Sequence, residues 1–113
     1  MNVKTKILLA VLLCTPFQSL AQNMNNSSVA MAYVCWQIAN GEGYEQDSNL
    51  FAKMISMVRK LPDFKAQSHY DYMGYAAQQV LKLDSSERKN MYIYGCEEPL
   101  KNIKRAESQG MLN

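Results

Sequence analysis

Residues 84–96, DSSERKNMYIYGC, hold the strongest local signal for the fold of this chain and also one of its cysteines. Asp84 is followed three positions later by Glu87, which is the spacing of a capping box, where each side chain accepts a hydrogen bond from the other residue's backbone N–H. A helix is therefore predicted to begin here and to carry Met91, Tyr92 and Cys96. The run MYIY at residues 91–94 also has β character, so an extended conformation competes with the helix there.

The first 21 residues are typical of a secretory signal peptide. Lys4 and Lys6 precede the apolar run ILLAVLLC at residues 7–14, which is far shorter than the ~20 residues needed to cross a bilayer. Small residues follow at the −3 and −1 positions of a cleavage site. We therefore expect cleavage between Ala21 and Gln22, export to the periplasm, and a single mature domain over residues 22–113.

The cysteines then predict a disulfide. Cys14 leaves with the signal peptide, and the large Leu13 before it disfavours the alternative that Cys14 is a lipoprotein cysteine. The mature domain keeps Cys35 and Cys96, and an even pair without CxxC spacing in a small exported domain predicts a structural bridge. Closing the loop between these residues contributes about 4 kcal/mol in the simple chain-entropy model.

Helical periodicity runs through the mature domain, and strand-like alternation is almost absent. Beside the helix that begins near Asp84, helices are predicted over residues 27–40, 47–60, 64–83 and 99–107. Gly41 is expected to end the first helix, and Gly74 to mark a close helix contact. The predicted fold class is all-α, a small antiparallel bundle of four to five helices with one disulfide. The expected core-facing positions include Val29, Tyr33, Trp36, Asn40, Leu50, Phe51, Met54, Ile55, Met57, Val58, Leu61, Ala66, Met73, Ala77, Val80 and Leu81.

Charge and composition narrow the function. The chain has 12 Lys and Arg and 10 Asp and Glu, and the excess of two lies in the signal peptide, so the mature domain is neutral. A neutral domain has no electrostatic reason to bind nucleic acid or an anionic membrane. His69 is the one histidine, and no nucleophile motif, metal cluster or phosphate loop accompanies it. We therefore expect no catalytic residue, no metal, no cofactor and no enzyme activity.

Two features remain as candidates for contact with a protein partner. The first is an acidic loop over residues 41–47, with Glu42, Glu45 and Asp47 around Tyr44; its alternative is a solvated connection that caps the next helix. The second is a group of tyrosines that includes Tyr72 and Tyr75, because tyrosine brings apolar area and a polar tip to interfaces at low entropic cost. The alternative for these tyrosines is a place at the edge of the core.

Three segments carry a resemblance to a known family: Tyr33-Val34-Cys35, the Leu61-Pro62 break, and MYIYGC at residues 91–96. With the leader and the helical pattern, the chain resembles the periplasmic immunity proteins that neutralise type VI secretion amidase effectors. The resemblance implies a periplasmic homodimer that plugs the catalytic groove of a cell-wall amidase with a projecting loop. Residues 41–47 are our own candidate for that loop. The small acid-stress chaperones of the periplasm, which share the single disulfide and the helical make-up, are the alternative.

Overall fold

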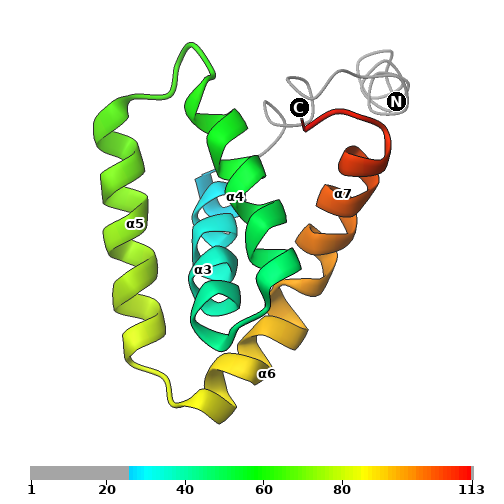
Figure 1. Ribbon diagram of the computed structural model, residues 1–113. Helices are drawn as coiled ribbons and strands as arrows, with labels where there is room; N and C mark the ends of the chain where they lie inside the picture. Colours follow the sequence, from blue (N-terminus) through cyan, green and yellow to red (C-terminus); the bar gives the residue numbers. More distant parts are fainter. Residues whose placement is uncertain (1–25, 113) are drawn as a thin grey trace, which may run out of the picture.

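The computed structural model describes residues 26–112, and this part of the chain folds into five helices (Figure 1). The predicted signal peptide and the cleavage site between Ala21 and Gln22 lie outside the described residues. The helices are α3 (Asn26–Glu42), α4 (Glu45–Arg59), α5 (Ala66–Leu81), α6 (Ser85–Gly95) and α7 (Glu97–Ser108). The predicted all-α fold is confirmed, and so is the Cys35–Cys96 disulfide, whose Cα atoms lie 5.7 Å apart.

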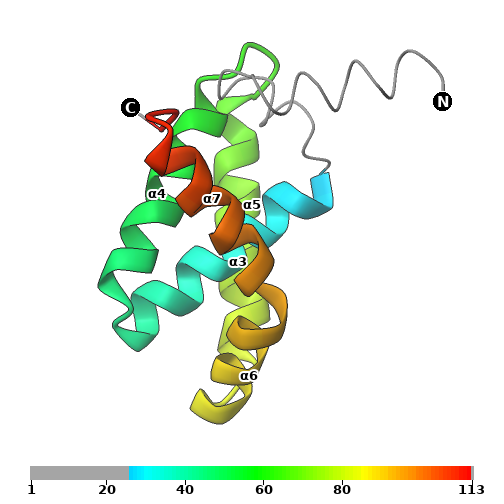
Figure 2. The same cartoon turned by 90° about the vertical axis from the view of Figure 1, so that its right-hand side faces the viewer.

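Helix α3 is the centre of the bundle. It packs against α4, α5 and α6, and the two views of the ribbon place α4 and α5 on different sides of it (Figures 1 and 2). Contact from three directions buries α3 on more than one face, so Val34, Cys35, Ile38 and Ala39 are in the core beside the predicted Tyr33. Asn40, which was expected to face the core, is exposed.

The outer helices each bury one face. Helix α4 turns Phe51, Met54, Ile55 and Val58 into the core as predicted, and α7 packs on its outer side through Ile103 and Ala106. Helix α5 packs on α3 through Ala76 and Val80. The prediction for Leu81 was wrong: the helix ends at this residue, and its side chain is exposed because no other helix covers it.

The turn between α3 and α4 is much shorter than predicted. Helix α3 continues through Gly41 to Glu42, and only Gly43 and Tyr44 separate it from α4. Gly43 has φ +82°, a conformation that glycine adopts without the steric cost of a Cβ, so it is Gly43 rather than Gly41 that allows the chain to leave the helix. The predicted loop over residues 41–47 therefore does not exist as a projecting element.

Helix α6 begins with the predicted capping box. The Glu87 N–H donates to Oδ1 of Asp84 over 2.8 Å, and the Asp84 N–H donates to Oε1 of Glu87 over 3.0 Å. Residues 91–94 are helical, which decides against the extended alternative. Cys96 ends α6 and precedes α7, so the disulfide fixes the joint between these helices to the middle of α3. None of the described helices has the length and apolar character that crossing a membrane requires.

Two local predictions differ from the structure. Helix α7 begins at Glu97, two residues before the predicted start at Pro99. Pro99 therefore lies in the first turn of α7, where a residue without an N–H is tolerated. Gly74 does not mark a close helix contact, since a Cβ added there would meet nothing within 4 Å. The close approach lies at Gly95, where an added Cβ would come 2.6 Å from Cε of Met31 on α3.

Candidate functional site

The acidic residues of the α3–α4 corner are largely engaged within the molecule. Glu42 accepts hydrogen bonds from Nε of Arg88 over 3.0 Å and from Oγ of Ser85 over 3.1 Å, and its side chain is only 10% exposed. The hydrogen bond from Arg88 is the main reason why the pKa of the Glu42 carboxyl lies below its ordinary value of 4.5. Glu42 therefore joins the end of α3 to the start of α6.

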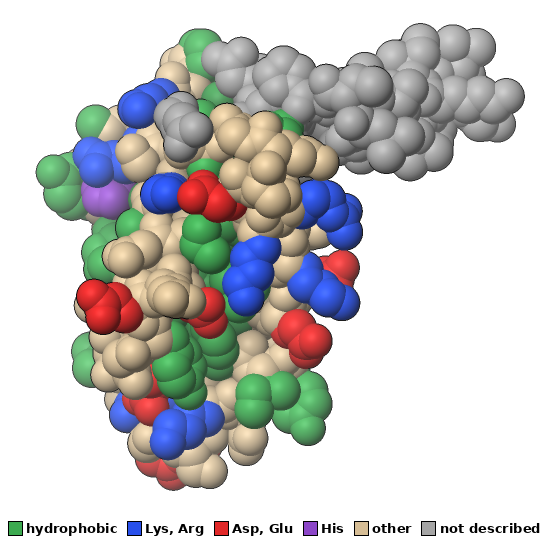
Figure 3. All heavy atoms as spheres, turned by 45° about the vertical axis from the view of Figure 1, so that its right-hand side comes forward, with side chains coloured by type: hydrophobic (Ala, Val, Ile, Leu, Met, Phe, Trp, Pro, Cys, Tyr) green, Lys and Arg blue, Asp and Glu red, His purple; other side chains and the backbone are tan. Residues whose placement is uncertain are grey.

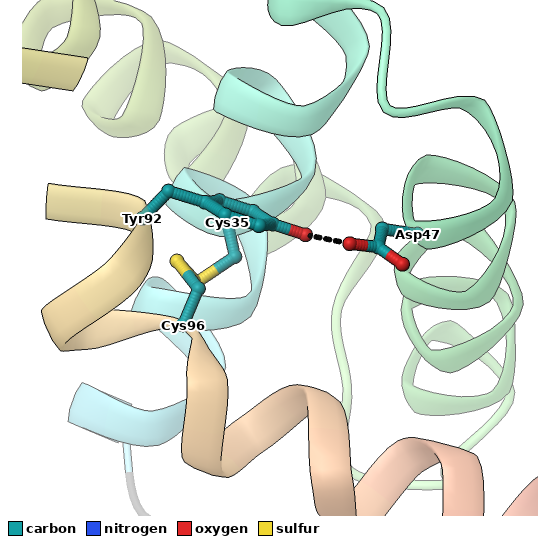
Figure 4. The surroundings of a disulfide bond; sticks show 4 residues. All are labelled: Cys35, Asp47, Tyr92 and Cys96. Carbon is teal, nitrogen blue, oxygen red and sulfur yellow. Dashed lines mark hydrogen bonds between the residues drawn. A yellow bond between two sulfur atoms is a disulfide. The ribbon is translucent and has the colours of Figure 1, made fainter. Parts of the chain in front are cut away.

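Asp47 makes a second such link next to the disulfide. Its Oδ2 accepts a 2.8 Å hydrogen bond from the hydroxyl of Tyr92, and Figure 4 shows the Tyr92 side chain beside the Cys35–Cys96 bridge and reaching toward Asp47. Burial, and then the bond to Asp47, raise the pKa of Tyr92. Tyr44 is half-buried against Tyr92, with ring centroids 5.1 Å apart.

Of the four residues proposed for the acidic loop, Glu45 alone is well exposed. Glu42 and Asp47 face α6, and Tyr44 lies over Tyr92. The corner therefore serves as a structural junction between α3, α4 and α6. The prediction of a projecting acidic loop over residues 41–47 was wrong, because two helix ends take the place of that loop.

The two tyrosines from the second candidate lie in one groove. It has a volume of about 600 Å³ and runs between the first half of α3 and the middle of α5. Tyr72 stacks on the buried Tyr33, with centroids 5.2 Å apart and planes 17° apart, so it belongs to the core edge and to the groove. Tyr75 is 48% exposed. The groove is lined by Ser27, Ala30, Met31, Val34, Asp71, Tyr72 and Tyr75.

A smaller cavity of about 230 Å³ lies near His69. The Tyr33 hydroxyl and Nδ1 of His69 are 2.9 Å apart, within hydrogen-bond distance. Burial lowers the pKa of His69, and the positive charge of Arg59 lowers it further, so the neutral ring is favoured. Burial also raises the pKa of Tyr33 to about 12. The cavity is lined by Trp36, Ala52, Ile55, Ser56, Arg59, His69 and Met73.

Sequence reasoning missed this cavity and part of the exposed apolar surface. The cavity requires α4 and α5 to stand apart over Trp36, and their spacing is a property of the packed bundle. Ile93 and Tyr94 on α6 are exposed, Tyr94 by 87%. The exposure of these two residues could have been predicted from the sequence. On a helical projection, Ile93 and Tyr94 fall away from the face that carries Tyr92 and Cys96.

The remaining surface carries charges of both signs. Figure 3 shows basic and acidic side chains interspersed on the face that it presents, with apolar side chains between them. Among residues 26–112 there is no group of three His, Cys, Asp or Glu side chains placed to hold a metal ion. The chain matches no protein family, no curated protein and no solved structure.

Proposed function

We propose that this protein acts by binding another protein through the groove between α3 and α5. The observation that carries the proposal is the composition of this groove. Met31 and Val34 supply an apolar floor, Tyr72 and Tyr75 supply aromatic walls, and Asp71 adds one carboxylate. Tyrosine is enriched among the residues that dominate binding energy, and methionine adapts its shape to a partner.

In this proposal the partner is a cell-wall amidase toxin, and the protein is an exported immunity protein that inhibits it. The proposal is supported by the predicted signal peptide, the disulfide, and the resemblance stated for the sequence. The α3–α4 corner does not project, so the groove replaces it as the proposed contact. We propose that an apolar segment of the amidase, with a basic residue opposite Asp71, enters this groove.

The experiment is a calorimetric titration of a purified type VI amidase effector from the same bacterium with the oxidised protein. We expect a nanomolar Kd, and at least a tenfold loss of affinity for Tyr75→Ser, since truncating a central interface tyrosine has effects of this size. Tyr70→Ser is the matched control, because Tyr70 is on the same helix, is 65% exposed and does not line the groove.

Glu45→Gln tests the α3–α4 corner separately, because Glu45 is exposed there and its loss breaks no described contact of the fold. Unchanged affinity is expected. A loss of affinity for Glu45→Gln with full affinity for Tyr75→Ser would return the contact to the corner. No binding of the amidase by the unaltered protein would remove the immunity proposal as a whole.

The alternative is a periplasmic acid-stress chaperone, and one observation favours it. The Glu42–Arg88 ion pair holds the α3–α4 corner to α6, and protonation of Glu42 at low pH would weaken that link. A chaperone should then expose apolar surface below about pH 4 and bind a hydrophobic dye there, while staying compact at pH 7. Protection of a denatured client protein at low pH, without affinity for an amidase, would decide for this alternative.

A further inference from the structure

The cavity beside His69 combines an apolar body with a cationic rim. Trp36 from α3 contributes to it together with Ile55 of α4 and Met73 of α5. Ser56 and Arg59 of α4 and His69 of α5 supply the polar groups. Positions 52, 55, 56 and 59 lie on one face of α4, and 69 and 73 on one face of α5, so both helices present a continuous surface to the cavity. Among the described residues, no Asp or Glu lines it.

The positive charge at the rim of the cavity comes from Arg59, and no carboxylate of the described residues pairs with it. Arg59 is exposed, and it forms no ion pair or hydrogen bond with the part of the chain that the structure describes. His69 uses Nδ1 toward Tyr33, which leaves Nε2 without a hydrogen bond inside residues 26–112. A guanidinium with five N–H donors and no carboxylate beside it is suited to a planar anion.

From this arrangement we propose that the cavity binds a small carboxylate with an apolar tail. The carboxylate pairs with the guanidinium of Arg59, with Ser56 and His69 as further hydrogen-bonding groups. The tail lies against Trp36, Ile55 and Met73. A cavity of about 230 Å³ has room for roughly eight atoms of the size of a water or a methylene. Octanoate, with about ten non-hydrogen atoms, is slightly larger than this room, and the cavity is open to solvent, so the site fits a medium-chain acid of this size better than a long lipid.

This inference is independent of the proposed protein partner. The cavity is lined on α5 by His69 and Met73, whereas the groove is lined by Asp71, Tyr72 and Tyr75, so the two sites open on different faces of that helix. No residue lines both sites, so a substitution in the lining of one leaves the lining of the other unchanged. Failure of the ligand experiment would therefore not bear on the amidase proposal. Failure of the amidase titration would likewise not bear on the ligand proposal.

The protein carries its own reporter for the test, because Trp36 lines the cavity and the chain has a single tryptophan. The oxidised protein at neutral pH is titrated with octanoate while the tryptophan emission is recorded. We expect a saturable change with half-saturation at or below about 1 mM, as for a ligand of about ten non-hydrogen atoms. Octan-1-ol should bind at least about tenfold more weakly, and octyltrimethylammonium should give no saturable change, because both lack the anion.

Arg59→Gln should weaken octanoate about tenfold or more and leave octan-1-ol unchanged, since it removes a charge-assisted hydrogen bond and little apolar area. Arg105→Gln on α7 is the matched control, because Arg105 is exposed and does not line the cavity. The inference is overturned if octanoate gives no saturable change, if octan-1-ol binds as well as octanoate, or if Arg59→Gln binds octanoate normally. The comparison of the three ligands on the unaltered protein stands even if a variant does not fold.

Discussion

The hydroxyl of Tyr92 is a single polar atom that links α6 to the first turn of α4, through its 2.8 Å hydrogen bond to Asp47. Tyr92→Phe removes this bond and keeps the ring, so the free energy of unfolding should fall by about 1 to 2 kcal/mol. Urea denaturation followed by circular dichroism measures the change. Tyr94→Phe is the control, because that side chain is almost fully exposed two residues away. Equal effects of the two substitutions would contradict the structural role of the bond.

Glu42 makes the stability of the fold depend on pH. Its pKa in the folded protein is lowered, chiefly by the hydrogen bond from Arg88, so its contribution to stability is present above about pH 4.5 and is lost as the pH falls through the folded pKa. Glu42→Gln should therefore lower stability at pH 7 and flatten the loss of stability below pH 4.5. Urea midpoints between pH 7 and pH 3 measure this.

Glu45→Gln is the matched control for Glu42, since Glu45 belongs to the same corner and is exposed. Its profile should follow that of the unaltered protein. If Glu42→Gln and the unaltered protein lose stability in parallel over the acidic range, the Arg88 bond contributes nothing to the pH dependence.

At the scale of the helix, replacing a glycine by alanine should change the stability of the protein in opposite directions in α5 and in the α3–α4 turn. Gly74 lies inside α5 with open space around the position of a Cβ, so Gly74→Ala should stabilise the protein by about 0.5 to 1 kcal/mol. Gly43 has φ +82°, so Gly43→Ala should destabilise it by about 1 kcal/mol. Thermal unfolding of both variants measures the effects, and an unchanged or raised melting temperature for Gly43→Ala would contradict the assignment of Gly43 as the residue that ends α3.

The sequence predicts the existence of each helix better than its ends. The capping box at Asp84 and Glu87 is a local interaction, so its spacing was enough to place the start of α6. Gly41 and Gly43 are the same residue type two positions apart, and only the folded backbone shows which of them has positive φ. The first helix was therefore ended two residues early, and a loop was predicted where α3 meets α4 almost directly.

Sequence patterns are also limited to local spacing when they are used to predict the candidate site. Glu42 and Asp47 find their partners in Arg88 and Tyr92, which are 46 and 45 positions away along the chain, so no local pattern distinguishes them from solvated acids. Tyr72 and Tyr75 lie one helical turn apart, and this local spacing was sufficient to predict that they share one side of their helix. The groove that they line needs α3 as its other wall, and it was not predicted. The cavity at His69 takes residues from three helices, and its existence follows from how those helices pack.

The whole molecule depends on the bridge that closes most of it into one loop. Both cysteines are fully buried, and 61 positions separate them. Replacing both by alanine should lower the free energy of unfolding by about 4 kcal/mol, because the unfolded chain regains the entropy of that loop. Urea unfolding of the double variant and of the oxidised protein gives the difference.

The oxidised protein should also resist a mild reductant in native buffer and lose the bridge quickly in urea. Rapid reduction without denaturant would contradict the burial of the bond.

The fold class of the whole molecule could be predicted, because helical periodicity and an isolated pair of cysteines are present in the sequence itself. The way in which the helices pack on one another could not be predicted from the sequence. Short connections favour helices that pack on their neighbours along the chain, but α4 and α5, which are consecutive, pack mainly on α3. This follows from the apolar residues on several sides of α3, which need cover from more than one partner.

The position of Cys96 near the end of the chain has a consequence for the order of assembly. In the export that we propose, a chain that enters the oxidising compartment N-terminus first delivers Cys35 there before its partner, which arrives only after another 61 residues. During that interval Cys35 can be captured by foreign thiols or by an oxidase. Under this proposal the Cys35–Cys96 bond can form only once α6 has crossed, so the last part of the export, rather than the first, would commit the protein to its native state.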